Sequence, residues 1–210
     1  MAKRTLLPLV ALGLLGVLAA YALRTVRPLG EDVGTSPAAV RMLEDRRSPQ
    51  VVSGEGTLTV VMFTDYQCPT CRLADPALRA AIARDGNVRV IYRDWPIFGE
   101  RSERAAEVAL AADRQGIYPA LHRRLMTSAS LDDTALRAAV GQAGGNWAQV
   151  EADLLSHGAE ISDQLAHNGS DAFSLGLEGT PGYLIGPLLV EGALTESEFL
   201  RAFDLARSSG

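Results

Sequence analysis

The sequence predicts an α/β domain in which a block of helices separates a strand–helix–strand half from a strand–strand–helix half. Two features predict it: nearly continuous apolar runs, typical of buried strands, occur at 58–63 and again at 183–190, and helical stripes fill the stretch between. The 210 residues are 47% apolar and 21% charged, which suffices for one substantial core and excludes intrinsic disorder. The net charge of −5 argues against a polyanionic partner, so we expect no nucleic-acid binding.

Residues 1–27 have the features of an export signal. Lys3 and Arg4 precede an uncharged apolar run at 6–23, and an Ala-Tyr-Ala sequence at 20–22 offers a signal peptidase a cleavage site. At about 1.5 Å per residue, this run spans about 27 Å, close to the roughly 30 Å of a bilayer core. We therefore expect either a cleaved signal peptide or a retained transmembrane helix, with the rest of the chain outside the cytoplasm.

Residues 28–49 mix Gly, Pro, Ser and charged residues without a sustained period, apart from one helical turn at 40–43. We expect a tether here, followed by a single folded domain at 50–210. The domain starts with a strand at 57–66, then a helix whose apolar double stripe indicates one buried face, then a strand at 88–95. This order predicts a parallel pair of strands joined by a right-handed crossover.

A helical insertion is predicted at about 100–176. Residues typical of helix starts occur along it: Ser102 as an N-cap, Pro119 in a first turn, and Asn146 as a second N-cap. Strands return at 183–185 and 188–190. A capping box from Thr195 to Glu198 then begins a final helix.

The two cysteines, Cys68 and Cys71, carry most of the chemical information. On a helix this spacing places their Cβ atoms about 5 to 6 Å apart, so a small adjustment closes a disulfide. Cys68 falls where strand becomes helix, and the unpaired amides and positive dipole end of the first turn favour its thiolate, which makes it the attacking sulfur. Pro69 suits the first helical position and leaves the amides of Thr70 and Cys71 free to point at that sulfur. We expect Cys71 to be more buried and to act as the resolving thiol.

Two other uses of the cysteine pair stay open. A structural disulfide would close a very short loop and gain little entropy. A zinc or copper half-site would need further ligands, and we expect each of the histidines, His122, His157 and His167, to be a surface or capped residue. Redox use, without a metal or an organic cofactor, is the favoured interpretation.

A second candidate element is Gly179-Thr180-Pro181, directly before the returning strand. A proline that opens a strand donates no hydrogen bond to the ladder, so its ordinary interpretation is the end of a loop. The position also makes a cis peptide bond worth testing.

These features together resemble the DsbA-like thiol:disulfide oxidoreductases of the bacterial envelope, within the thioredoxin superfamily. The resemblance covers residues from about 50 to 208 and rests on these segments: F-T-D-Y-Q-C-P-T-C at 63–71, Pro76, Y-R-D-W-P at 92–96, S-E-R-A-A at 102–106 and G-T-P at 179–181. It implies a thioredoxin-like fold with a helical insertion between the βαβ and ββα halves. It also implies that Pro181 is cis, and that Thr180 and Pro181 flank the cysteine pair, where the Thr180 backbone would pair with an extended substrate.

One position departs from the family pattern. Members often carry an acid six residues before the first cysteine, where it takes part in proton transfer with the buried thiol, and this chain has Met62 there. Asp65 should face the other side of the strand, as a turn or capping residue. Arg72 follows the pair directly; it would stabilise the Cys68 thiolate if it reached the sulfur, but a solvated charge is the ordinary interpretation.

We therefore expect an enzyme: a monomeric dithiol oxidase that introduces disulfides into exported proteins through Cys68 and Cys71, and that a membrane redox partner reoxidises. The expected location is the periplasm or the extracytoplasmic face of a bacterial inner membrane, anchored if residues 1–27 are retained. The alternatives are a disulfide isomerase or reductant of the same fold, and a non-catalytic adaptor or metallochaperone.

Overall fold

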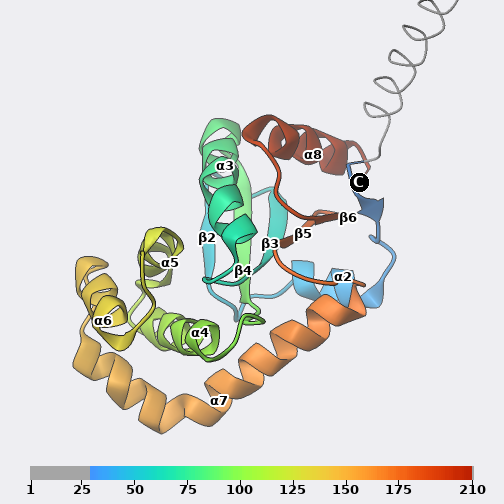
Figure 1. Ribbon diagram of the computed structural model, residues 1–210. Coiled ribbons are helices and arrows are strands. Elements are labelled where there is room, and N and C mark those ends of the chain that lie inside the picture. The colour runs from blue at the N-terminus through green and yellow to red at the C-terminus, as the bar shows by residue number, and fades with distance from the viewer. Residues whose placement is uncertain (1–28, 210) are drawn as a thin grey trace, which may run out of the picture.

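The computed structural model describes residues 29–209 and contains a six-stranded mixed sheet (Figure 1). The strands are β1 (Glu31–Asp32), β2 (Gln50–Val52), β3 (Leu58–Thr64), β4 (Val88–Asp94), β5 (Gly182–Ile185) and β6 (Leu188–Glu191). They lie in the order β1-β6-β5-β3-β4-β2. β3 and β4 are parallel, as predicted, and the other neighbouring pairs are antiparallel.

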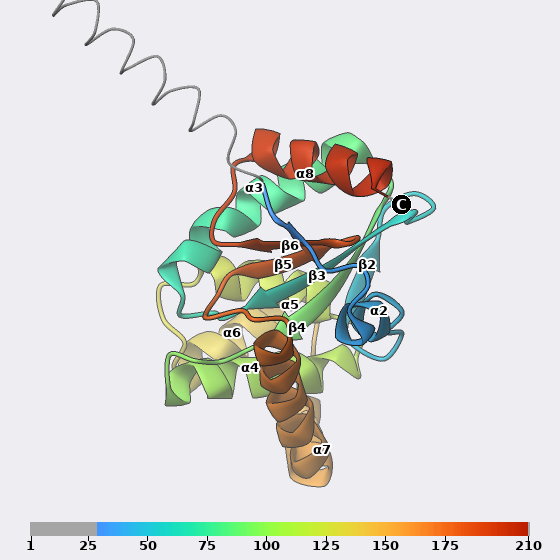
Figure 2. The same cartoon turned by 90° about the vertical axis from the view of Figure 1, so that its right-hand side faces the viewer.

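Helices cover both faces of this sheet (Figure 2). They are α2 (Pro37–Leu43), α3 (Pro69–Asp85), α4 (Glu100–Asp113), α5 (Tyr118–Thr127), α6 (Asp133–Gln142), α7 (Trp147–Ser174) and α8 (Glu196–Ser208). α3 and α8 lie side by side on one face, and α2 lies on the other. The α/β class and the thioredoxin-like arrangement with a helical insertion are confirmed.

The central strand β3 is buried on both sides, which explains its continuous apolar run. Val60 and Met62 belong to the hydrophobic cluster beneath α3 and α8, whereas Val61 and Phe63 belong to the cluster that contains α2 and the end of α7. Side chains alternate between the two faces of a strand, so a strand covered on both faces needs apolar residues at consecutive positions.

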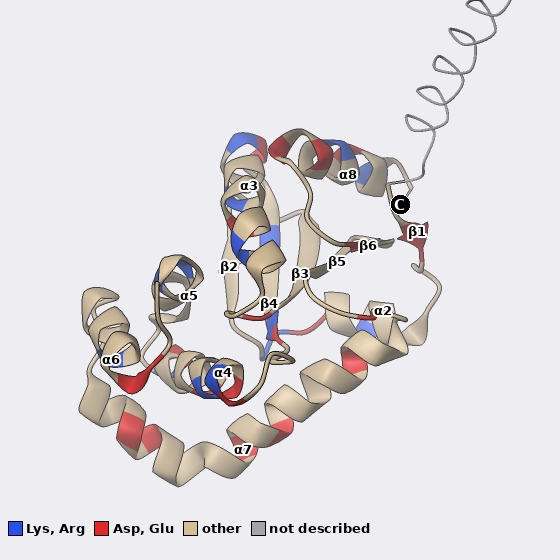
Figure 3. Ribbon diagram, viewed as in Figure 1, with Lys and Arg blue, Asp and Glu red and all other residues tan. Residues whose placement is uncertain are grey.

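The insertion between β4 and β5 consists of α4, α5, α6 and α7. Pro119 lies in the first turn of α5, and the Asn146 side chain accepts from the amides of Ala148 and Gln149 at the start of α7, as predicted. The helix α7 carries five acidic residues but no lysine or arginine (Figure 3).

The prediction of Ser102 as an N-cap is wrong. The helix α4 begins at Glu100, and its N-cap is Gly99 with φ of 91°, a left-handed backbone conformation that favours glycine. Ser102 is instead fully buried in the first turn. Its hydroxyl donates to the carboxylate of Asp65, which is 37 residues away in sequence. A local sequence pattern gives no indication of such a contact.

Residues 31–43, which we expected to be part of a tether, are folded onto the domain. β1 pairs with β6 at the sheet edge, and α2 places Ala39 and Met42, at most 1% exposed, against the sheet. The expected helical turn at 40–43 lies within α2. A two-residue acidic strand has no hydrophobic period, so the sequence offered little to predict it.

The predicted export signal at 1–27 lies outside the described residues. Among residues 29–209, no helix combines the length and apolar character that crossing a bilayer requires.

Candidate active site

Cys68 is the N-cap of α3, four residues after the end of β3. Its backbone is extended, Pro69 occupies the first helical turn, and the sulfur accepts a hydrogen bond from the Cys71 amide at 3.3 Å. The prediction that Cys68 lies where strand becomes helix is confirmed. We expected the amides of both Thr70 and Cys71 to point at this sulfur. The structure shows a hydrogen bond from the Cys71 amide.

Cys71 lies one turn further along the same helix, and both cysteines are free thiols. We expected Cys71 to be the more buried of the two, but each residue is 2% exposed. Burial raises the pKa of the Cys71 thiol to about 12, and the facing Thr180 hydroxyl offsets part of that effect. Cys71 is therefore held as a thiol, which suits a group that ionises only when it reacts.

Thr180 and Pro181 lie directly beside the cysteine pair, although they are more than a hundred residues away in sequence. The carbonyl oxygen of Thr180 is 3.3 Å from Cys68 Sγ, within hydrogen-bonding distance of the thiol. The Thr180–Pro181 peptide bond is cis. Both implications of the family resemblance for this segment, its position and its cis bond, are confirmed.

Asp65 fixes the loop that leads into the helical insertion. Its buried carboxylate accepts from the amides of Gln67 (2.7 Å), Ile97 (2.7 Å) and Phe98 (3.0 Å), and from the Ser102 hydroxyl (2.6 Å). Asp65 is thus the turn and capping residue that we expected. It ties the turn before Cys68 to the loop between β4 and α4.

Arg72 is neither a solvated charge nor a partner of the Cys68 sulfur. Its guanidinium donates to the backbone carbonyls of Tyr66 (2.7 Å), Leu125 (3.1 Å) and Ser128 (2.6 Å). Arg72 therefore connects the turn before Cys68 to the end of α5. The expected electrostatic effect of Arg72 on the thiolate has no support in this geometry.

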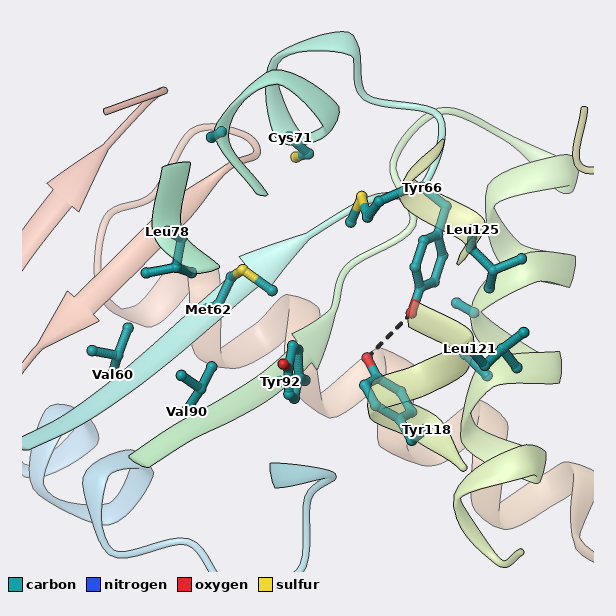
Figure 4. Close-up of a cluster of buried hydrophobic side chains, with 14 of the residues drawn as sticks. Val60, Met62, Tyr66, Cys71, Leu78, Val90, Tyr92, Tyr118, Leu121 and Leu125 are labelled. Atoms are coloured by element: carbon teal, nitrogen blue, oxygen red, sulfur yellow. Dashed lines mark hydrogen bonds between the residues drawn. The ribbon is translucent and has the colours of Figure 1, made fainter. Parts of the chain in front are cut away.

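Sequence reasoning missed a buried polar group on the insertion side of the site. His122 is 1% exposed, contrary to the surface or capped position that we expected, and it contacts Tyr66 and Asp75. Met62 lies in the hydrophobic cluster beneath Cys71, where Figure 4 shows it beside Tyr92. The His122 contacts join residues 56 and 47 positions apart, so no sequence spacing could have shown them.

Within residues 29–209, no three His, Cys, Asp or Glu side chains gather as a metal site would require. The polar groups around the pair include the Thr180 carbonyl, the Thr180 and Thr64 hydroxyls and the Cys71 amide. The site combines a helix-capping cysteine, a second cysteine one turn later and a proline segment beside them, on a thioredoxin-like sheet. This combination defines the class of protein-disulfide oxidoreductases.

Comparison with known proteins identifies the family. Residues 59–204 match the model of the DSBA-like thioredoxin domain, and the chain belongs to this family. Among solved structures, the chain is similar to a thioredoxin-like oxidoreductase from Silicibacter pomeroyi (35% identity, TM-score 0.75, covering 80% of this chain and 97% of that one). It is also similar to a periplasmic thioredoxin-like protein from Salmonella enterica serovar Typhimurium (27% identity, TM-score 0.72, covering 82% and 97%).

A curated relative is a much longer protein. Over 74 residues the chain is 35% identical to the Na(+)/H(+) antiporter NhaA 3 of Salinispora tropica, a match that covers 34% of this chain and 11% of that protein. The chain thus spans about a tenth of the length of this relative.

Proposed function

We propose that Cys68 and Cys71 form the redox pair of a dithiol oxidase that introduces disulfides into exported proteins. The observation that carries this proposal is the place of the Cys68 sulfur: at the start of α3, accepting from the Cys71 amide and lying 3.3 Å from the Thr180 carbonyl. An amide donor and the helix dipole stabilise an anion there. A stabilised thiolate is a good leaving group, so the disulfide of this pair is readily reduced and therefore oxidising.

The reaction begins with the oxidised pair. A substrate thiolate attacks Cys68 Sγ, the Cys68–Cys71 bond breaks, and Cys71 leaves with the electron pair and takes up a proton. A second substrate thiolate then attacks the substrate sulfur of the mixed disulfide and releases Cys68 as a thiolate. Two electrons have moved from the substrate dithiol to the enzyme, and the substrate carries a new disulfide.

The surroundings of the pair suit an extended, unfolded substrate. Pro69 and Thr70 are exposed beside Cys68, and Thr180 and Pro181 form the facing wall, where the Thr180 backbone would pair with the substrate by strand addition. Ile97 and Phe98, 45% and 50% exposed, lie on the loop that Asp65 fixes. Exposed apolar side chains on a loop bonded to Asp65 and Gln67, just before Cys68, favour the unfolded segments of a substrate over a folded surface.

The export signal predicted at 1–27 and the periplasmic relative both support a location on the extracytoplasmic side of a bacterial inner membrane. Exported proteins with free cysteines are the substrates, and a membrane redox partner restores the disulfide. Whether residues 1–27 anchor the enzyme or are removed does not alter the reaction.

A direct test mixes the oxidised full-length chain with a reduced, unfolded model protein that contains two cysteines. We expect the model protein to gain one disulfide while one equivalent of enzyme becomes reduced. The Cys68→Ser variant is the matched control and should transfer nothing. Rearrangement of a wrongly paired substrate without net oxidation would instead support an isomerase, and tight binding of one copper or zinc without exchange would support a metallochaperone.

A further inference from the structure

The sulfur that leaves first in the proposed reaction is a deeply buried one. When a substrate thiolate attacks Cys68, the Cys68–Cys71 bond breaks and its electron pair goes to Cys71 Sγ. Cys71 is 2% exposed, so water does not solvate the new charge. Burial raises the pKa of this thiol to about 12, and a thiol of high pKa is a poor leaving group. The protein itself must therefore supply the groups that stabilise the departing sulfur.

Three hydrogen-bond donors from two segments of the chain face Cys71 Sγ. They are the Thr64 hydroxyl and the Asp65 amide at the end of β3, and the Thr180 hydroxyl before β5. Each of them favours the thiolate of Cys71 over the thiol, whereas the neighbouring Cys68 sulfur acts in the opposite direction in the reduced pair. We call these three donors the thiolate pocket.

The strand β3 places Thr64 on the side of the sheet that carries the cysteine pair. Side chains alternate between the faces of a strand, so Thr64 shares a face with Val60 and Met62, which pack in the same hydrophobic cluster as Cys71. Figure 4 shows Met62 and Cys71 on this side of β3. The side chains of Val60 and Met62 have no hydrogen to donate. Thr64, 1% exposed, is the residue of this strand face that brings a donor to the sulfur.

The Thr180 hydroxyl has no better use in the resting protein. Its oxygen is buried without a hydrogen-bond partner among the described residues, and the group that it faces is the Cys71 sulfur. A neutral sulfur is a weak acceptor, so this donor stays unsatisfied while Cys71 is a thiol or part of a disulfide. An unsatisfied buried donor destabilises the resting state and gains its bond when the sulfur becomes an anion.

Both hydroxyls are held by neighbouring strands of the sheet. The strands β3 and β5 are antiparallel, with Phe63 opposite Gly182. Thr64 directly follows Phe63, and Thr180 lies two residues before Gly182, so the two threonines extend the paired strands at the same end. The Thr180 carbonyl oxygen is 3.3 Å from Cys68 Sγ, which places this end beside the cysteine pair. The donors are therefore in position before the charge forms, which is the arrangement that stabilises a transition state most effectively.

We propose that Thr64 and Thr180 are catalytic residues of the exchange reaction: their hydroxyls donate to Cys71 Sγ as the Cys68–Cys71 bond breaks, and they stabilise the leaving sulfur in the transition state. The inference rests on the proposed redox role of the cysteine pair. The hydroxyls keep their hydrogens throughout, and the proton that Cys71 finally takes up comes from solution. The same donors act in the reverse direction, when Cys71 attacks a mixed disulfide of Cys68.

This role predicts an effect on the rate of exchange and not on its equilibrium. At neutral pH, Cys71 is uncharged in both end states, as a thiol in the reduced pair and as half of a disulfide in the oxidised pair. Loss of a hydroxyl therefore changes the free energies of the two end states little. The negative charge exists only during the exchange, so the donors act on the barrier.

The test measures rate and equilibrium on the same proteins at pH 7. The oxidised full-length chain is mixed with excess dithiothreitol, quenched with acid at intervals, and the loss of the Cys68–Cys71 disulfide is followed by alkylation and mass. The second thiol of dithiothreitol closes a ring rapidly, so the attack on Cys68 limits the rate. The equilibrium constant is then measured against reduced and oxidised glutathione.

Two variants remove one hydroxyl each and keep the branched shape of the side chain. Thr64→Val and Thr180→Val should each be reduced about tenfold more slowly than the wild type, because a hydrogen bond to a charged group is lost. Their equilibrium constants should stay within about twofold of the wild-type value. Thr64→Ser keeps the donor and should react within about threefold of the wild-type rate. The matched control is Thr134→Val, the same change at an exposed position of α6, which should leave both values unchanged.

Urea unfolding shows that each variant folds. If Thr64→Val does not, Thr180→Val decides the result. A wild-type rate in either valine variant would overturn the inference, and so would an equal loss in Thr64→Ser or an equilibrium constant that shifts as far as the rate. A wild-type chain that exchanges with neither dithiothreitol nor glutathione would instead overturn the proposed redox function, and this inference with it.

Discussion

At the start of α3, two physical effects act on one sulfur atom. The Cys71 amide donates to Cys68 Sγ at 3.3 Å, and the positive end of the helix dipole points at the same atom. The second sulfur experiences the opposite environment, because burial raises the pKa of Cys71 to about 12. The pair is thus chemically asymmetric, which supports the proposed roles of Cys68 in attack and of Cys71 in resolution.

Replacing the resolving thiol should trap the reaction halfway. In Cys71→Ser, Cys68 still forms a mixed disulfide with a substrate, but the second sulfur that releases it is missing. We expect disulfide-linked complexes to accumulate in cells and to disappear on reduction, as seen on non-reducing gels. Cys68→Ser is the control and should trap nothing. Equal trapping by both variants would contradict the assigned roles.

The buried carboxyl of Asp94 gives a prediction about stability. Its pKa is about 7 in the fold against 3.8 normally, so the folded state holds a proton between these values that the unfolded state has lost. The free energy of unfolding of the wild type should therefore fall as the pH rises from about 4 to about 7, by up to roughly 4 kcal/mol. In Asp94→Asn this contribution is absent, so the variant should gain stability relative to the wild type over that range.

Urea unfolding at a series of pH values measures this difference. Tyr92→Phe, a change in the same cluster, should leave the pH dependence as in the wild type. A constant difference between wild type and Asp94→Asn from pH 4 to pH 8 would show that Asp94 has an ordinary pKa.

Some residues of the site could be predicted from the local sequence, and others could not. Cys68 and Cys71 were predictable because their roles depend on local helix geometry, three residues apart. The contact of Tyr66 with His122 spans 56 residues, and that of Asp65 with Ser102 spans 37. Long-range polar contacts of this kind have no sequence period, so the positions of His122 and Ser102 were mistaken.

At the scale of elements, the loop between β4 and α4 depends on the fixed geometry of the turn before Cys68. Asp65 receives four hydrogen bonds, two of them from consecutive amides of that loop, Ile97 and Phe98. All four donors converge on one carboxylate, which fixes the loop against that turn. The sequence predicted β3, α3 and β4 because each has a clear hydrophobic period, but not the loop that joins β4 to the insertion.

Removing this carboxylate should destabilise the fold and loosen the loop. Asp65→Ala leaves the part-buried amides of Ile97 and Phe98 and the Ser102 hydroxyl hydrogen without an acceptor. Each donor that water does not reach costs about 1 to 3 kcal/mol. We expect a total loss of about 3 to 5 kcal/mol in urea unfolding and faster proteolysis at the 96–99 loop. Ser102→Ala removes the bond to Asp65 and the bond that Ser102 accepts from Gln67 Nε2, and it should cost about 1 to 2 kcal/mol. A loss in Asp65→Ala no larger than in Ser102→Ala would refute the anchoring role.

At the scale of the molecule, one arginine joins the sheet to both the N-terminal segment and the insertion. Arg93 at the end of β4 contacts Asp45 at 2.7 Å, Asn168 at 3.0 Å and Asp171 at 3.5 Å. The Arg93 side chain is 9% exposed, so these contacts are shielded from solvent. The folded position of residues 31–49, which their composition did not predict, depends on contacts of this kind rather than on a local pattern.

Arg93→Ala should cost about 3 to 5 kcal/mol in the free energy of unfolding, since it leaves Asp45 and Asp171 without their cation. The matched control is Arg114→Ala, which breaks an exposed ion pair with Glu160 and should cost less than about 1 kcal/mol. Chemical unfolding of the two variants gives both values. Similar losses in the two would show that Arg93 does not hold the segments together.

The central claim is that the Cys68–Cys71 disulfide is strongly oxidising because the fold stabilises the Cys68 thiolate. The most direct measurement is the equilibrium of the full-length chain with reduced and oxidised glutathione at pH 7, with the fraction of reduced pair determined by alkylation and mass. The account predicts a potential nearer to the roughly −120 mV of a strong dithiol oxidant than to the roughly −270 mV of thioredoxin. A value at or below about −270 mV would contradict it and indicate a reductant.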